Sequence, residues 1–277
     1  LSHSDFKHTS FKNTNLKNTN LYSTEFLEVD LTKIKNKSLA GANLIGTAIP
    51  YSNLSGINLD GSILGFLNWQ SSNLSGIDFT VIQNKFIEAS VFLGANLSNT
   101  NFEGIMFPNK NDQGHLIIYE FKMINGAHLA NKSLSELSVE LHNKKFYGRW
   151  VIEKKVVGND LLVKYIRYND FSKTNLHNAN LSNADLTSAL FSQADLTNAD
   201  LSNSILRGAN ASKANLNNAN LSNADLTSAY FPQADLTNAD LSNAILSKTI
   251  LDNAILNNVI LNGAILNCVN HPICIQE

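Results

Sequence analysis

Three side chains near the C-terminus have the types and the spacing that could bind a metal ion. They are Cys268, His271 and Cys274, and two residues separate each from the next. Structural zinc normally takes four ligands, but only three are present here, beside Pro272. The pattern therefore predicts two free thiols and no metal site. The other histidines are scattered: His3, His8, His115, His128, His142 and His177.

The cysteine count also bears on the cellular compartment. Cys268 and Cys274 are the only cysteines, too few for the disulfide framework of a small secreted protein. We therefore expect a reducing compartment and a cytoplasmic protein. The first residues, LSHSDFKHTS, lack the apolar core of a signal peptide. The missing initiator Met indicates a trimmed start, so a delivery signal could have been lost.

Acidic side chains recur forty residues apart, and such pairs could in principle serve catalysis. The pairs are Asp185 with Asp225, Asp195 with Asp235, and Asp200 with Asp240. An active site needs convergent polar groups in a pocket, whereas these carboxylates are expected on a convex outer wall. We expect them to keep the protein soluble and to hydrogen-bond turn backbone groups. The sequence has no HExxH, P-loop, GxSxG or Gly-rich dinucleotide motif, so we predict no catalytic residue and no cofactor.

Basic and aromatic side chains gather between residues 144 and 168. A surface of this kind could hold an acidic partner or nucleic acid. The alternative, which we favour, is a solvated lysine face on a hairpin whose aromatic rings pack inward. The candidate partner-binding residues are Arg149, Trp150, Lys154, Lys155, Lys164, Tyr165 and Arg167.

Overall composition gives no sign of a nucleic-acid or membrane-surface binder. Charged residues make up 16% of the 277 residues, and the formal net charge is -2. No global field therefore attracts a polyanion or an anionic membrane. No apolar run approaches the roughly 20 residues that span a bilayer. We expect a protein partner, no membrane span and no nucleic-acid binding.

A five-residue repeat organises most of the chain. The segments NLSNADLTSALFSQADLTNADLSN (180–203) and NLSNADLTSAYFPQADLTNADLSN (220–243) are nearly identical. Each unit has a central Leu or Phe, a small residue two positions earlier, and usually Asp or Asn between them. The rhythm is unbroken over 171–266 and looser over 6–31, 39–79 and 92–107. It slips at 32–38 and 80–91, where we expect loops or bulges.

A period of five fits neither a helix nor a strand, so the chain must wind in another way. If the central and small residues both point inward and a turn follows each unit, four units close one coil around a narrow square axis. Successive coils then pair through their backbones, and residue n lies beneath residue n+20. The small inward residue is a steric requirement, because a larger side chain would collide across the axis.

This pattern resembles the pentapeptide-repeat family, whose motif A(D/N)LXX is matched closely over 171–266 and loosely over 1–107. The resemblance implies an all-β solenoid, a right-handed quadrilateral β-helix. Some members of the family dimerise through their C-terminal coils. Some protect or inhibit DNA gyrase by mimicking duplex DNA with an acidic rod.

The period of five disappears between Pro108 and about Tyr168, which indicates a small inserted α+β module. Residues 114–124 are typical of a strand, and 131–143 of a helix with Ser133 and Glu136 as a capping box. Residues 147–168 are typical of a hairpin that turns at Gly158, Asn159 and Asp160. We therefore divide the chain into a repeat helix over 1–107, the insert over 108–168, and a second repeat helix with a capping or dimer tail over 169–277.

The last units differ from the rest at the outward position before the central Leu. This position is mostly Asp or Asn from 180 to 240, but five isoleucines occupy it at the end of the repeat. A contiguous apolar patch on a terminal coil normally marks an interface, and the unpaired backbone edges there need a cap. We predict a homodimer interface, with capping by the tail CVNHPICIQE as the alternative. The interface residues are Ile245, Ile250, Ile255, Ile260 and Ile265.

These observations predict a non-catalytic binding or scaffold protein that presents a rigid rod and an inserted module to a protein partner. Two other functions stay open. One is a DNA-mimicking regulator or protector of DNA gyrase or another topoisomerase, although the repeat aspartates fall on three of the four faces and coexist with lysines. The other is a translocated bacterial effector that uses the rod as a platform.

Overall fold

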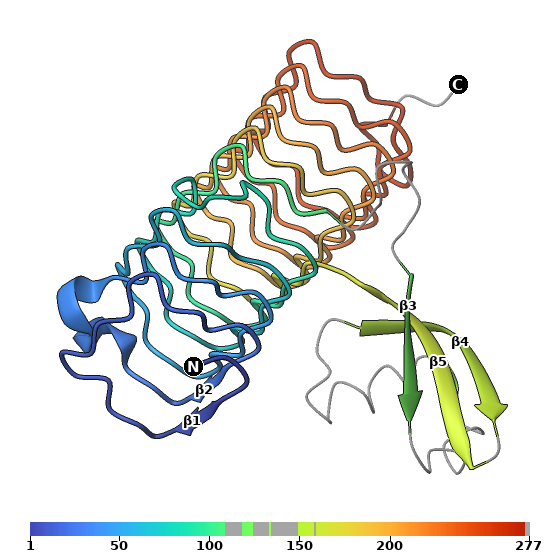
Figure 1. Cartoon of the computed structure of the whole chain (residues 1–277). Helices are drawn as coiled ribbons and strands as arrows, with labels where there is room; N and C mark the ends of the chain where they lie inside the picture. The colour runs from blue at the N-terminus through green and yellow to red at the C-terminus, as the bar shows by residue number, and fades with distance from the viewer. Residues whose placement is uncertain (109–117, 124–132, 134–148, 158, 275–277) are drawn as a thin grey trace.

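The computed structural model describes residues 1–108, 118–123, 133, 149–157 and 159–274. The repeats form one long four-sided rod, with the N-terminal coils at one end and the C-terminal coils at the other (Figure 1). A three-stranded sheet lies beside the rod. The expectation of a four-sided β solenoid is therefore met.

Each unit of the rod turns a corner because its backbone can adopt a left-handed residue there. In the unit centred on Leu176, the Ala179 amide donates to the Leu176 carbonyl at 2.9 Å, and Asn178 between them has φ of 56°. A four-residue turn with positive φ at its third residue suits Asn, whose short polar side chain tolerates this region. Asn occupies this corner in many units, and other residues, such as Gly208 and Lys213, take the same left-handed conformation in the rest.

Parallel backbone bridges join successive coils along the whole rod. Asn175 pairs with Asp195, Asp195 with Asn215, and Asn215 with Asp235, so each bridge joins positions that lie four units apart. At the N-terminal end the bridges lengthen into two short parallel strands, β1 (Asp5–Lys7) and β2 (Glu25–Leu27). The expected n+20 stacking is confirmed wherever the repeat is regular.

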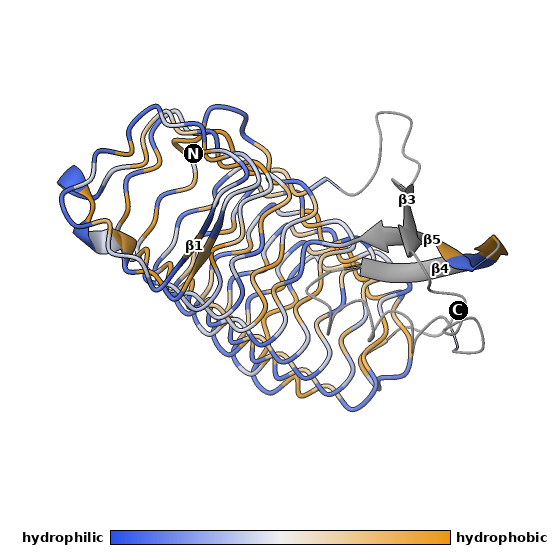
Figure 2. Ribbon diagram, turned by 60° about the horizontal axis from the view of Figure 1, so that its bottom comes forward, coloured by the Kyte–Doolittle hydropathy of each residue, from blue (hydrophilic) through white to orange (hydrophobic). Residues whose placement is uncertain are grey.

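The core is a set of columns built from central and small inward side chains. Ala179, Ala184 and Ala189 are as fully buried as the central Leu181 and Leu186. Colours of high and low hydropathy alternate along each coil, as Figure 2 shows. In one column Phe92, Phe171 and Phe191 stack face to face, with ring centroids 5.1 Å apart at both steps. Because Phe92 precedes the insert and Phe171 follows it, one continuous core crosses the insertion point.

Both register slips are short extrusions from the coil. Asp30 pairs with Asn53, and Asp78 pairs with Asn101, so each partner comes three positions later than the regular register requires. At the first slip two 3-10 turns, η1 (Leu31–Lys33) and η2 (Lys35–Lys37), push out a corner while Ile34 stays buried in the core. The loops expected at 32–38 and 80–91 are therefore present.

The described part of the insert is an antiparallel sheet in the order β3-β5-β4. Its strands are β3 (Ile118–Met123), β4 (Arg149–Val157) and β5 (Asp160–Arg167). The strand predicted at 114–124 and the hairpin predicted at 147–168 are confirmed over the residues that the structure describes there, with a register shift between Val151 and Glu153. The predicted helix at 131–143 lies outside the described residues, apart from the exposed Ser133.

The buried side chain of Asn169 closes the rod where the insert leaves it. Its Nδ2 donates to the Phe107 carbonyl at 3.0 Å, and its Oδ1 accepts from the Ser90 amide at 2.9 Å. Val91 pairs with Asp170, so a regular bridge between coils spans the whole insertion. The two ends of the insert therefore meet at one corner of the rod, as expected.

Candidate interaction surfaces

The outside of the rod consists of four walls. Phe171 marks wall 1, Leu176 wall 2, Leu181 wall 3 and Leu186 wall 4. Each wall also includes the units that stack on its marker residue in the other coils. The residue before each centre lies on the outer surface of its wall. Where it is Asp or Asn, its side chain fixes the next turn. Asp185 Oδ1, for example, accepts from the amide and the hydroxyl of Thr187, at 3.0 and 2.6 Å. The repeat aspartates are thus turn residues, as predicted.

Two of these aspartates have altered acidity. Partial burial would raise the pKa of the Asp225 carboxyl, but hydrogen bonds from Thr227 and Arg207 outweigh it and hold the pKa below the ordinary 3.8. The Arg207 Nε lies 2.6 Å from Asp225 Oδ2. The pKa of Asp235 is lowered in the same way, by Thr237 and Asn217 against partial burial. Both carboxylates therefore act as charged acceptors within the wall.

Charge is unevenly shared among the walls. Between Ser38 and Leu266 the described rod has no Lys or Arg in the units of walls 2 and 3. Those present belong to wall 1, to wall 4, or to the loop at 80–91 that leads into wall 4. Lys173 and Lys213 stand at the corner where wall 1 meets wall 2. Walls 2 and 3 thus form one acidic, amide-rich surface. Its acidic residues are Asp60, Asp78, Glu103, Asp195, Asp200, Asp235 and Asp240.

The five isoleucines of the predicted interface are not equally accessible. Ile255, Ile260 and Ile265 are exposed, at 45%, 45% and 47% of their full surface, whereas Ile245 and Ile250 are half-buried. Leu256 and Leu261 at the centres of the last coil are also only partly buried, although Leu236 and Leu241 one coil earlier are fully buried. The end of the repeat therefore presents an apolar surface.

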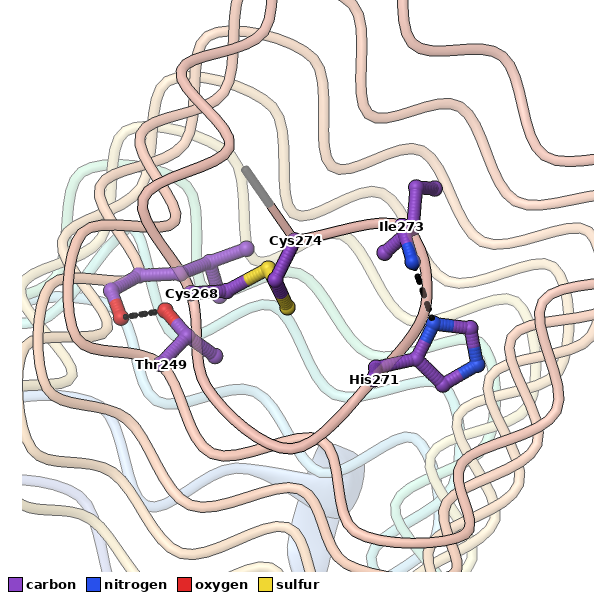
Figure 3. The surroundings of a disulfide bond; sticks show 6 residues. Thr249, Cys268, His271, Ile273 and Cys274 are labelled. Carbon is purple, nitrogen blue, oxygen red and sulfur yellow. Dashed lines mark hydrogen bonds between the residues drawn. A yellow bond between two sulfur atoms is a disulfide. The ribbon is translucent and has the colours of Figure 1, made fainter. Parts of the chain in front are cut away.

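The tail after the last coil corrects the prediction of two free thiols. Cys268 and Cys274 form a disulfide, with their Cα atoms 4.9 Å apart. A turn brings them together, because the Cys274 amide donates to the His271 carbonyl at 3.0 Å and the Ile273 amide donates to His271 Nδ1 at 3.2 Å. In Figure 3 the tail forms a closed loop in front of the coils. With no free thiol, the cysteines no longer indicate a reducing compartment.

The structure describes the predicted partner-binding residues of the insert mainly through their backbones. Arg149 pairs with Arg167, and Val151 with Tyr165. Trp150 lies opposite Ile166, while Lys164 pairs with Glu153 on β4 and Glu120 on β3. All seven therefore belong to one hairpin. Lys155 at its outer end is exposed, next to the exposed Val156 and Val157.

Metal sites, membrane spans and grooves are the other kinds of candidate site in the described residues. No cluster of three or more His, Cys, Asp or Glu side chains that could hold a metal ion occurs there. No helix in the described ranges is long and apolar enough to cross a bilayer. A groove of about 430 Å³ lies on wall 1 near the N-terminal end. It is lined by Glu25, Leu27, Glu28, Ala48, Pro50, Tyr51 and Asn68.

Two features were missed by the sequence analysis. Asn169 takes the place of a small inward residue, and only its position at the end of the irregular segment hints at its role as a clamp. Val269 pairs with Ile250, so the tail adds one more bridge to wall 1. Val269 comes one position earlier than the regular register requires, which hid this pairing from a search at period five.

Comparison with known proteins gives a consistent picture of the repeats. The family model described as pentapeptide repeats matches in eight copies, over residues 1–35, 38–80, 170–208, 194–233, 204–243 and 234–270. A search among curated proteins finds no match.

Several solved structures are similar in outline. One is the crystal structure of HetL, a pentapeptide repeat protein involved in heterocyst differentiation regulation in the cyanobacterium Nostoc sp., with 20% identity over 99% of this chain and 92% of that one, and a TM-score of 0.49. Rfr23, a pentapeptide repeat protein from the cyanobacterium Cyanothece, has 22% identity over 72% of this chain and 91% of that one, and a TM-score of 0.23.

A third similar structure is full-length QnrB1, a plasmid-mediated fluoroquinolone resistance protein. It has 16% identity over 94% of this chain and 90% of that one, and a TM-score of 0.24. Identities and TM-scores this low carry no functional argument.

Proposed function

Because the chain belongs to the pentapeptide-repeat family, whose model matches more than half of it, we propose that it is a non-catalytic binding or scaffold protein. The observation that carries this proposal is the filled core, since the central and small inward side chains of the repeat units are buried from Leu21 to Ala254, between the two end coils. Recognition must then use the outer walls or the insert. In the right-handed quadrilateral helix that the family implies, these walls are rigid surfaces for a protein partner.

The insert is the first place to look for that partner. It interrupts a rod that is continuous without it, and its hairpin carries the basic and aromatic residues between Arg149 and Arg167. We keep the three-part division of the chain at 107 and 168 for this reason. The rod then acts as the scaffold and the insert as one of its binding elements.

Affinity capture followed by binding measurements tests this proposal. The full chain and a variant lacking 109–167 serve as baits, and each retained protein is then purified and titrated by calorimetry. We expect a partner that binds the full chain and binds the shortened variant at least about 10-fold more weakly, or one that binds both through the walls. Failure of every purified candidate to bind either protein, or turnover of a small molecule by the full chain, would contradict the proposal.

We also propose that the protein is a homodimer that meets end to end through the C-terminal coils. The apolar set of Ile245, Ile250, Ile255, Ile260 and Ile265 supports this, because a contiguous exposed patch normally marks an interface. The first coil differs, since the charged side chains of Asp5 and Lys7 lie on its edge strand and oppose pairing with another chain. The contact is therefore C-terminal coil to C-terminal coil, which closes a dimer instead of extending a filament.

Light scattering across a concentration series measures this self-association. The dimer should dissociate to a soluble monomer when Ile250, Ile255 and Ile260 are all changed to Asp, because charges in the contact would be desolvated. A wild-type protein that stays monomeric at high concentration refutes the dimer.

A DNA-mimicking regulator or protector of DNA gyrase or another topoisomerase is a second candidate. It is favoured by the acidic surface of walls 2 and 3, which holds seven acidic residues and no Lys or Arg over the described rod beyond Ser38. A supercoiling assay with purified gyrase tests it. Changing Asp195, Asp200, Asp235 and Asp240 to Asn should remove any effect, and a wild-type protein without effect on supercoiling rules this candidate out.

A translocated bacterial effector is a third candidate, and the Cys268–Cys274 disulfide favours it over the cytoplasmic location expected from free thiols. Disulfides persist mainly in oxidising compartments. Mass spectrometry of the protein alkylated in cells before lysis would reveal its state. A disulfide in protein recovered outside the producing cell supports this candidate, whereas two alkylated thiols in protein confined to the cytoplasm contradict it.

A further inference from the structure

The tail after the last coil is tied down onto wall 1. The Val269 amide donates to the Thr249 carbonyl at 2.8 Å, and the Leu251 amide donates to the Val269 carbonyl at 3.1 Å. Cys268 is 8% exposed and belongs to the core, while Ile273 and Cys274 pack against it (Figure 3). The edge of wall 1 is therefore already paired at the end of the repeat, and Ile250 is half-buried beneath Val269.

Walls 2, 3 and 4 end differently. In earlier coils the central amide donates to the next coil, as Leu236 does to the Ile255 carbonyl and Leu241 to the Ile260 carbonyl, both at 2.8 Å. Within the described residues, no coil follows the last central residues of these walls to accept the same bond. All three walls end in the sequence Ile-Leu-Asn, and their last isoleucines, Ile255, Ile260 and Ile265, are exposed. These three edges combine apolar side chains with central amides that have no further coil to bond.

The chemistry of this end fits a second copy of the same chain. No Asp, Glu, Lys or Arg occurs between Asn253 and Cys274. An isologous contact brings each patch against its own copy, so any charge near the axis would face the same charge. A neutral surface avoids this repulsion, whereas a partner of opposite charge would gain nothing here. The first coil, with Asp5, Lys7 and Lys12, offers no comparable surface.

We propose that the disulfide-closed tail covers wall 1 and leaves walls 2, 3 and 4 of the last coil as the surface that binds the second copy. This inference rests on the proposed homodimer and specifies which part of the apolar set makes the contact. Ile255, Ile260 and Ile265 then lie in the contact, and Ile250 lies outside it, half-buried beneath Val269.

Variants that change different walls of the last coil test the inference. Ile255→Asp together with Ile260→Asp should weaken self-association at least about 100-fold, measured by sedimentation equilibrium, while Ile250→Asp should change it less than about 3-fold. The fold should tolerate these changes, because Asp235 and Asp240 occupy the same positions one coil earlier. Ile205→Asp, an exposed outward position on wall 4 far from the end, controls for an added charge.

Removing the disulfide gives an independent measurement. In Cys268→Ser with Cys274→Ser, the tail loses its covalent closure and is held on wall 1 by the bridge of Val269 and the packing of Ile273, so it should leave wall 1 more readily. Ile250→Asp should then weaken self-association at least about 10-fold. Equal effects of Ile250→Asp and the paired variant in the oxidised protein would overturn the inference but leave the dimer intact. A monomeric wild type would instead refute the dimer itself.

Discussion

At the scale of single residues, the small inward position shows how one steric rule combines with hydrogen bonding. Alanine meets the rule and brings no polar atom into the core. Serine and threonine also fit, but their hydroxyls need a partner in the core. Thr174 Oγ1 donates to the Phe92 carbonyl at 3.0 Å, and Thr249 Oγ1 donates to the Leu226 carbonyl at 2.7 Å. Each bonds a carbonyl of a preceding coil, so a polar residue here also joins coils.

Ser62 is an exception, and its replacement should stabilise the protein. Its hydroxyl is fully buried and has no hydrogen-bond partner among the described residues. An unsatisfied buried polar group costs about 1–3 kcal/mol. Ser62→Ala should therefore raise the free energy of unfolding by about 1 kcal/mol, measured by urea denaturation.

Ser72→Ala is the matched control for this measurement. Its hydroxyl is equally buried, but it donates to the Ile49 carbonyl and accepts from the Ser52 amide. Losing these bonds should cost about 1–3 kcal/mol. If both alanine variants lose stability alike, the Ser62 hydroxyl has a partner after all.

The aspartates of the walls should make stability sensitive to acid. Because the pKa values of Asp225 and Asp235 are lowered on folding, their contribution is present above the ordinary value of 3.8 and is lost as pH falls through the folded-state values. Arg207 is largely exposed, so each contribution is below about 1 kcal/mol. Changing both to Asn should flatten the fall in unfolding free energy below about pH 4, measured by urea denaturation at several pH values. An equal slope in the double variant and the wild-type protein would contradict this account.

At the scale of elements, the columns of the core decide how each coil adds stability. The column of Phe92, Phe171 and Phe191 continues through Ala211 to Phe231 and Leu251. The aromatic stack is thus interrupted by one methyl side chain. Each face-to-face aromatic step contributes about 0.5–1.5 kcal/mol beyond burial. The interruption is a place where the rod is less stable than its own pattern allows.

Ala211→Phe should therefore raise the free energy of unfolding, by about 1 kcal/mol, because it continues the stack of Phe191. Thermal and urea denaturation measure the change. Ala209→Phe is the matched control: it puts the same ring at a small inward position two residues away, where overpacking should cost about 1–3 kcal/mol or more. Equal destabilisation by both changes would mean that neighbouring side chains already fill the space beside Ala211.

The period of the sequence predicts these elements where it is strict and fails where it slips. Columns and walls follow from spacing alone, because residues twenty apart must stack. The number of residues extruded at 32–38 could not be predicted, since Ile34 could equally have been an outward residue of a loop. The disulfide was missed for a similar reason. A disulfide needs the two Cα atoms within about 4.4–6.8 Å of each other. The turn from His271 to Cys274 brings the two cysteines within this distance, but it lies outside the repeat, so the period of five does not predict it.

At the scale of the whole molecule, the rod and the insert are built so that one does not interrupt the other. Stacking of Phe92 on Phe171 carries the core past the insertion, and the Asn169 side chain bonds both sides of it. The insert can thus differ from the rod in composition and fold without disturbing the columns. A scaffold that keeps its stability in the rod leaves the inserted hairpin free to carry a partner.

Deleting 109–167 should accordingly leave a folded rod. The deletion removes as many residues as the insert adds, so Val91 and Asp170 return to the regular n to n+20 register. Pro108 then joins Tyr168, and Asn169 keeps its bonds to Phe107 and Ser90. We expect a cooperative thermal transition within about 5 °C of the full chain, because a change of about 1 kcal/mol shifts the midpoint of a domain this large by only a few degrees. Deleting 109–169 instead leaves the coil two residues short and removes Asn169, so that variant should unfold at much lower temperature. If the two deletions behave alike, the insert supports the rod, and the separation of scaffold from binding module is wrong.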